Sequence, residues 1–116
     1  MDKGKTAEKA ALKWLIGHHL SLLVSNYNCR FGEIDLIMLD QGTLVFVEVR
    51  LRSSAKFGGA VSSVNGKKQQ KIITTAKHFL MENNKYSQYY CRFDVIAFES
   101  GTAQSCPLWY KDAFRL

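Results

Sequence analysis

Apolar residues recur along the chain with two different spacings, and each spacing predicts a different element. In residues 6–20 and from about 65 to 82 they return at three- and four-residue intervals, as on one face of a helix. In residues 32–52 they alternate with other residues, and Val, Ile, Leu and Phe dominate, which is typical of two strands joined by a tight turn. Residues 21–30 and 91–98 are shorter segments that each predict one more strand.

These elements predict a single domain of the α/β class that spans residues 1–116. The expected order is α-β-β-β-α-β, with a mixed sheet flanked by helices. A chain of 116 residues, 47% of them hydrophobic, has room for one modest core. Asn65 or Ser63 is expected to cap the second helix, residues 51–63 to form a loop, and the tail after Gly101 receives no assignment.

The cysteine pattern and the N-terminal sequence predict a cytoplasmic protein. The three cysteines show no CxxC spacing, which indicates reduced thiols and neither a disulfide framework nor a zinc site. Lysines run through the first residues without the apolar core of a signal peptide. Apolar runs are also too short to span a bilayer, so no membrane partner is expected.

Positive charge is concentrated in the second half of the predicted fold. Sixteen Lys and Arg residues against ten Asp and Glu residues give a net charge of +6, and residues 49–81 contain no acid. Two explanations stand beside each other: a surface that contacts the phosphates of a nucleic acid, or an ordinary solvated basic face. On the first explanation, the residues expected to contact DNA are Arg52, Lys56, Lys67, Lys68 and Lys71.

Acidic side chains interrupt the most regular hairpin of the chain. If Gln41–Gly42 forms a two-residue turn, Asp35 lies directly opposite Glu48, and Glu33 lies opposite Arg50, all on one face. Two carboxylates about 5 Å apart repel by roughly 3 kcal/mol at an effective dielectric constant near 20. A shared proton, a neighbouring Arg or Lys, or a bound divalent cation is expected to offset this repulsion. A one-residue bulge would move the two acids to opposite faces.

Two interpretations of these acids remain open from the residues alone. One is a salt-bridged pair of strands, with Glu33 and Arg50 as a rung. The other is a site for a hard cation such as Mg²⁺, which prefers a few carboxylates, water and substrate phosphate. In the second case the basic residue two positions after Glu48 would stabilise negative charge that develops on a phosphate. Separately, Asp94 is expected to be a structural partner of Arg92 or another basic residue rather than a ligand.

The order of these residues supports a resemblance to a known family. Asp35, followed by Glu48-Val49-Arg50, resembles the motif of the PD-(D/E)XK nucleases, the restriction-endonuclease-like superfamily, whose core has the α-β-β-β-α-β order. More narrowly, the chain resembles the bacterial YraN family, which is similar to archaeal Holliday-junction resolvases. The matching segments cover most of residues 4–98: Glu8 with Ala11, GEIDLI at 32–37, FVEVRLR at 46–52, FGGAVSSV at 57–64, Lys68 with Ala76 and Leu80, and RFDVIAF at 92–98.

This resemblance implies a metal-dependent endonuclease that hydrolyses phosphodiester bonds of DNA, including branched or junction structures. It implies that Asp35 and Glu48 bind Mg²⁺ or Mn²⁺, with the carbonyl of Val49 as a further ligand. Glu8 would be the helix carboxylate of the site, although an acid in a first helical turn also suits the helix dipole. Lys68 would approach the same site, or else be a solvated lysine. Resolvases act on two-fold symmetric junctions, which implies a homodimer.

Arg50 is the main departure from the superfamily, most members of which have lysine there. Arginine stays protonated in proteins and cannot act as a general base, but it can hold a phosphate oxygen. One alternative function is therefore a nucleic-acid-binding module that keeps the nuclease fold without catalysis. Another is a protein-interaction domain in which the acids form salt bridges only.

Overall fold

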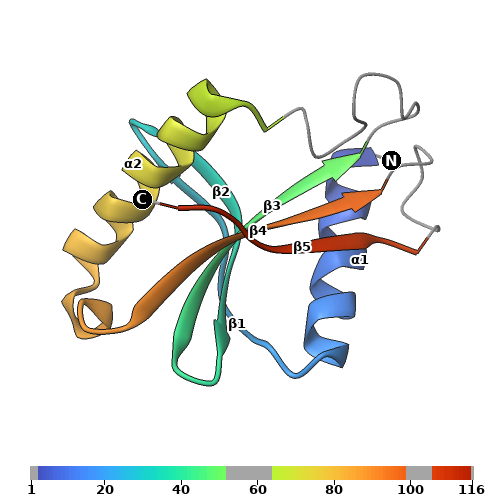
Figure 1. Ribbon diagram of the computed structural model, residues 1–116, viewed down its shortest axis with the longest axis horizontal. Helices are drawn as coiled ribbons and strands as arrows, with labels where there is room; N and C mark the ends of the chain where they lie inside the picture. The colour runs from blue at the N-terminus through green and yellow to red at the C-terminus, as the bar shows by residue number, and fades with distance from the viewer. Residues whose placement is uncertain (1–2, 52–63, 99–105, 116) are drawn as a thin grey trace.

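Two α-helices, a five-stranded sheet and a short 3₁₀ helix make up the described part of the chain (Figure 1). The computed structural model describes residues 3–51, 64–98 and 106–115. In chain order the elements are α1 (Lys3–Gly17), β1 (Ser21–Cys29), β2 (Gly32–Asp40), β3 (Thr43–Leu51), α2 (Gly66–Glu82), the 3₁₀ helix η3 (Asn84–Tyr86), β4 (Tyr90–Phe98) and β5 (Leu108–Phe114). None of these helices is long and apolar enough to cross a membrane.

The sheet is mixed, and its strands lie in the order β1-β2-β3-β4-β5. β3 and β4 are parallel, whereas the other neighbours are antiparallel. A parallel pair needs a long crossover connection, and α2 is part of the connection here. The predicted mixed α/β class is therefore confirmed, and the tail that received no assignment contributes the edge strand β5.

The two helices cover opposite faces of the sheet (Figure 1). On β3, Leu44 and Phe46 pack with the buried residues of α2, whereas Val45 and Val47 pack with those of α1. All four side chains are buried. A strand that is covered on both faces reads as a continuous apolar run, which explains the sequence LVFV. The polar residues that follow in β3 begin where this double cover ends.

Local signals in the sequence fix the hairpin turn and the start of α2. Gln41 and Gly42 have φ angles of 55° and 103°, the left-handed conformation that a two-residue hairpin turn of type I′ requires. Asp40 pairs with Thr43 across this turn, as predicted. Asn65, one of the two predicted caps, begins α2 and accepts a hydrogen bond from the amide of Lys68 at 3.1 Å.

The first helix runs from Lys3 to Gly17 and not over the predicted residues 6–20. His19 has a φ angle of 73°, and the amide of Leu20 donates to the carbonyl of Leu15 at 3.1 Å. This left-handed residue ends the helix and turns the chain so that Leu20 is buried against the sheet. Leu20 continues the apolar spacing of the helix, so the sequence pattern included it in the helix, but it lies in the turn that follows.

A buried carboxylate holds β5 against β4. Asp94 is fully buried, and it accepts hydrogen bonds from the indole of Trp109 and the amide of Asp112, each at 2.9 Å. The guanidinium of Arg92 donates to Asp94 at 3.0 Å and pairs with Asp40 at 3.0 Å. The predicted partnership of Asp94 and Arg92 is confirmed, and the carboxylate is structural because its bonds to Trp109 and Asp112 join β4 to β5.

Candidate functional site

The β2–β3 ladder ends just before the acidic residues of the hairpin. The predicted register holds from Asp40↔Thr43 to Leu36↔Val47. Beyond that pair, the carboxylate of Asp35 accepts the amide N–H of Val49 at 2.8 Å. A side-chain oxygen thus takes the place of a backbone acceptor. The predicted rung between Asp35 and Glu48 is therefore not part of the ladder, although the two carboxyl groups are still hydrogen-bonded to each other.

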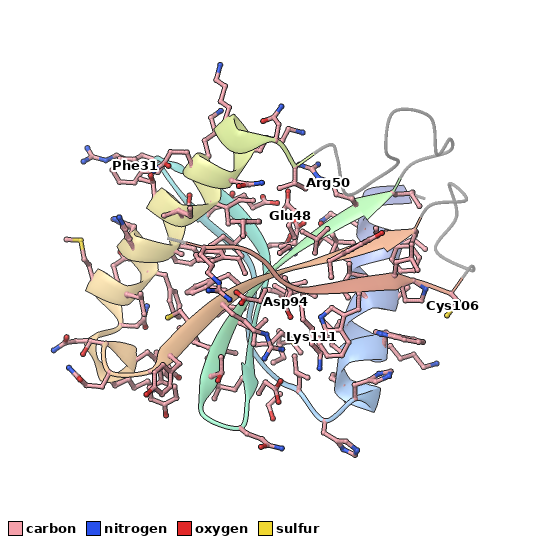
Figure 2. All side chains as sticks on the ribbon, viewed as in Figure 1. Phe31, Glu48, Arg50, Asp94, Cys106 and Lys111 are labelled. Atoms are coloured by element: carbon pink, nitrogen blue, oxygen red, sulfur yellow. The ribbon has the colours of Figure 1, made fainter. Side chains whose placement is uncertain are left out.

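A cavity of about 490 Å³ opens where the two strands separate. Three elements line it: Gly4, Ala7 and Glu8 from α1, Glu33 and Asp35 from β2, and Glu48, Val49, Arg50 and Leu51 from β3. Figure 2 shows Glu48 and Arg50 near each other, on the side of the molecule where α2 begins. The structure therefore brings Glu8, Asp35, Glu48 and Arg50, which the sequence predicted as site residues, around one cavity.

Three carboxylates form the most closely spaced acidic group among the described residues. One oxygen from each of Glu8, Glu33 and Asp35 lies within 4.8 Å of the others, an arrangement that could hold a metal ion. Asn26, which has a left-handed φ of 54°, hydrogen-bonds to the carboxylate of Glu8. Sequence reasoning missed Asn26 because a polar residue on an edge strand carries no signal of its role.

Glu33 and Arg50 do not form the predicted rung of the hairpin. Arg50 forms its ion pair with Glu48, at 2.9 Å between Nη2 and Oε2. Glu33 lies with Glu8 and Asp35 instead. The reason is that the ladder ends at Leu36, so backbone pairing no longer holds Glu33 opposite Arg50. Sequence reasoning thus placed Glu33 close to the site but gave it the wrong partner.

The carboxyl groups of the cavity hold protons more tightly than carboxyl groups in water. Burial, the negative charge of Glu48 and the hydrogen bond that protonated Asp35 donates to the Glu48 carboxylate together raise the pKa of Asp35 to about 8. Burial also raises the pKa of Glu48, against the opposing effects of its hydrogen bond to Asp35 and of the Arg50 and Lys68 charges. Near neutral pH, Asp35 and Glu48 therefore share a proton. Burial and the charges of Asp35 and Glu33 raise the pKa of Glu8 as well.

Two cations approach the pair from different elements. The Arg50 side chain, 23% exposed, contacts Glu48, and its Nε is buried without a hydrogen-bond partner in the described part of the chain. Lys68, in the first turn of α2, lowers the pKa of Glu48 through its charge. A shared proton and neighbouring cations, two of the three predicted ways to offset the repulsion, are thus present together. The carbonyl of Val49 stays a predicted ligand.

The basic residues predicted to contact DNA are only partly covered by the structure. Lys67 and Lys71 are exposed on the first turns of α2, and Lys68 is half-buried and near enough to Glu48 for its charge to lower the pKa of that residue. Arg52 and Lys56 lie outside the described residues, as does most of the FGGAVSSV segment. The start of α2 therefore presents positive charge beside the acidic cavity.

Comparison with known proteins places the chain in a family. The family model described as "Uncharacterised protein family UPF0102" matches residues 7–98. A UPF0102 protein of Psychromonas ingrahamii is 52% identical over 114 residues, which cover 98% of this chain and 90% of that protein. A UPF0102 protein of Saccharophagus degradans is 50% identical over 115 residues, covering 99% and 94%. The chain therefore belongs to the uncharacterised protein family UPF0102, the YraN-type family that its sequence predicted.

Proposed function

We propose that this protein is a metal-dependent endonuclease that hydrolyses phosphodiester bonds of DNA in the cavity between α1, β2 and β3. The observation that carries the proposal is the convergence of Glu8, Glu33, Asp35 and Glu48 on one cavity that Arg50 also lines. A small domain gains no stability from gathering four acids, since like charges repel. The similarity of Asp35 and Glu48-Val49-Arg50 to the PD-(D/E)XK motif supports the same conclusion.

The donor set suits a hard divalent cation such as Mg²⁺ or Mn²⁺. Carboxylate oxygens are the ligands that these ions prefer, and Asp35 and Glu48 share a proton whose place a cation would take. Asp35 and Glu48 would hold the ion, with the carbonyl of Val49, while Glu8 and Glu33 flank it. When bound, the cation supplies a Lewis acid beside the scissile phosphate.

The other residues of the cavity would bind the phosphate and accept a proton. Arg50 would exchange its contact with Glu48 for a phosphate oxygen, because its guanidinium stays protonated and carries several donors. Arginine cannot take a proton from the attacking water. We assign that role to Glu8, whose raised pKa brings its proton affinity closer to neutral pH.

The predicted partner is DNA, including branched structures, and the predicted assembly is a homodimer. Exposed Lys67 and Lys71 on α2 and the net charge of +6 support contact with phosphates. The homodimer rests on the resemblance to resolvases, which act on two-fold symmetric junctions.

The test is cleavage of a synthetic four-way junction and of a linear duplex by purified protein, with Mg²⁺, Mn²⁺ or EDTA. Cleavage should need the metal and should be lost in Asp35→Asn and in Glu48→Gln, each of which removes one charge without changing side-chain size. Both variants should still bind DNA, because binding depends on the basic residues. Cleavage that survives both substitutions would point to a contaminating nuclease and would refute the proposal.

One observation favours a second candidate, a nucleic-acid-binding module that keeps the nuclease fold without catalysis. The ion pair of Arg50 with Glu48 and the shared proton on Asp35 neutralise much of the site without any metal. Salt-sensitive DNA binding together with metal binding, but without cleavage of any substrate, would support this candidate over the endonuclease.

A further inference from the structure

The turn between β1 and β2 presents an aromatic side chain that the proposed active site does not use. Phe31 is 38% exposed, and the guanidinium carbon of Arg30 lies 4.8 Å from the centre of its ring. Figure 2 shows Phe31 and Arg50 on opposite sides of α2. A single exposed phenylalanine needs no function, so the argument depends on how this one is held and where it lies.

Several contacts hold the turn firmly against α2. The ring of Phe31 meets the ring of His78 at 5.7 Å, with the planes 62° apart. The amide of Phe31 donates to the sulfur of Cys29 at 3.4 Å. Gly32 has a φ of 150°, and a Cβ atom on it would come within 3.1 Å of the Thr75 hydroxyl. The turn is therefore packed closely on the helix, and Phe31 is an exposed but oriented side chain.

Phe31 lies close to the acidic cavity along β2. It lies in the turn before β2 and precedes Asp35 by four residues, and a strand rises about 3.3 Å per residue, so the Cα atoms of Phe31 and Asp35 are at most about 13 Å apart. That distance is about four nucleotide steps of 3.4 Å. The cavity is lined by α1 and the turn packs on α2, so a nucleic acid whose phosphate occupied the cavity would reach the turn by passing over the end of β2.

The chemistry of the turn suits a nucleobase. Phenylalanine rings and arginine guanidinium planes both stack on bases, and arginine also pairs with phosphate. A base inside a continuous duplex is already stacked on its neighbours and offers no free face. We propose that the Arg30–Phe31 turn is a stacking platform for an unpaired or unstacked base of branched DNA, next to the cavity. This inference rests on the proposed function and names the substrate feature that the site would select.

The experiment measures equilibrium binding in EDTA, where cleavage is absent, of a fluorescently labelled four-way junction and of a linear duplex of the same sequence. Phe31→Ala should weaken junction binding by about 5- to 150-fold, the range for one stacked base, and should leave duplex binding within about 2-fold of the wild-type value. Phe31→Leu keeps an apolar side chain but not the aromatic face, so it should behave like Phe31→Ala. Phe31→Trp should retain the junction preference.

The matched control is Tyr90→Ala. Tyr90 is 84% exposed, but it pairs with Thr43 at the opposite end of β3 from Glu48. The Tyr90→Ala variant should bind the junction and the duplex with the same affinities as the wild type. Equal losses on junction and duplex in Phe31→Leu, or no loss, would overturn the stacking platform while leaving the endonuclease proposal intact. If the wild type binds neither DNA at low salt, both proposals fail together.

Discussion

Replacement of Asp35 by asparagine is expected to stabilise the metal-free protein at and above neutral pH. Asparagine keeps an oxygen that can accept the Val49 amide, which donates to Asp35 at 2.8 Å. It removes the charge that repels Glu48 inside the cavity. Most substitutions at half-buried positions destabilise a protein, so an increase in stability would be a specific consequence of the acidic pair.

The size of the effect follows from the repulsion between two carboxylates. At about 5 Å and an effective dielectric constant near 20, this repulsion is roughly 3 kcal/mol. The pKa of Asp35 rises from its ordinary value of 3.8 to about 8 on folding. Between these values the folded state binds a proton that the unfolded state lacks, so the free energy of unfolding falls as the pH rises from about 4 to about 8. Asp35→Asn removes this fall in the free energy of unfolding, because asparagine does not titrate.

The assay is thermal unfolding followed by circular dichroism, in EDTA, from pH 5 to pH 8.5. At pH 8 the variant should unfold about 10 °C above the wild type, since about 3 kcal/mol corresponds to a shift of that order for a domain of this size. At pH 5 the difference should be much smaller, because pH 5 is only about one unit above the ordinary pKa of an aspartate, so little of the fall in the free energy of unfolding has accumulated. A variant less stable than the wild type at every pH, or a difference that does not change with pH, would refute the reasoning.

Asp94→Asn is the control of opposite sign. This carboxylate is also buried, but it is surrounded by donors from Arg92, Trp109 and the amide of Asp112. Its replacement removes one of the two carboxylates that pair with the half-buried Arg92, the other being Asp40, and should destabilise the protein by about 3 kcal/mol. If Asp35→Asn raises stability and Asp94→Asn lowers it, the gain at Asp35 comes from relief of charge repulsion and not from the introduction of asparagine as such.

Two further predictions concern cleavage and DNA binding. Arg50→Lys should retain cleavage, since either side chain supplies positive charge at the phosphate, whereas Arg50→Ala should lose about 100-fold or more in single-turnover cleavage rate. If Lys68 contacts a phosphate, Lys68→Ala should reduce the slope of log affinity against log salt by about one unit. Lys85→Ala should leave that slope unchanged, because Lys85 follows the far end of the 17-residue α2; equal slopes for both variants would argue against contact at Lys68.

The sequence predicted the hairpin well as far as backbone pairing governs it. A Gln-Gly turn fixes the register of its two strands, and the pairs from Asp40↔Thr43 to Leu36↔Val47 follow that register. The alternation of apolar residues could not predict where the ladder ends, because there the carboxylate of Asp35, and not a backbone carbonyl, accepts the amide N–H of Val49. Glu33 consequently lies with Glu8 rather than with the predicted Arg50.

The edge strand β5 was beyond prediction for a related reason. Its residues alternate only weakly between exposed and half-buried positions, so periodicity gives little signal. The strand is held by contacts between distant residues, above all the bond from the Trp109 indole to Asp94 on β4. Such a bond is invisible until the partner strand is in place, whereas the short-range cap that Asn65 provides for α2 could be predicted from neighbouring residues alone.

The most direct test of the central claim is calorimetric titration of the wild-type protein and Asp35→Asn with Mn²⁺ at pH 7, in two buffers with different ionisation enthalpies. If Asp35 and Glu48 form a divalent-cation site, the wild type should bind Mn²⁺ and release roughly one proton, because the cation displaces the proton that the pair shares. Asp35→Asn should lose both the binding and the proton release. Absence of binding to the wild type, or equal binding by Asp35→Asn, would contradict the claim.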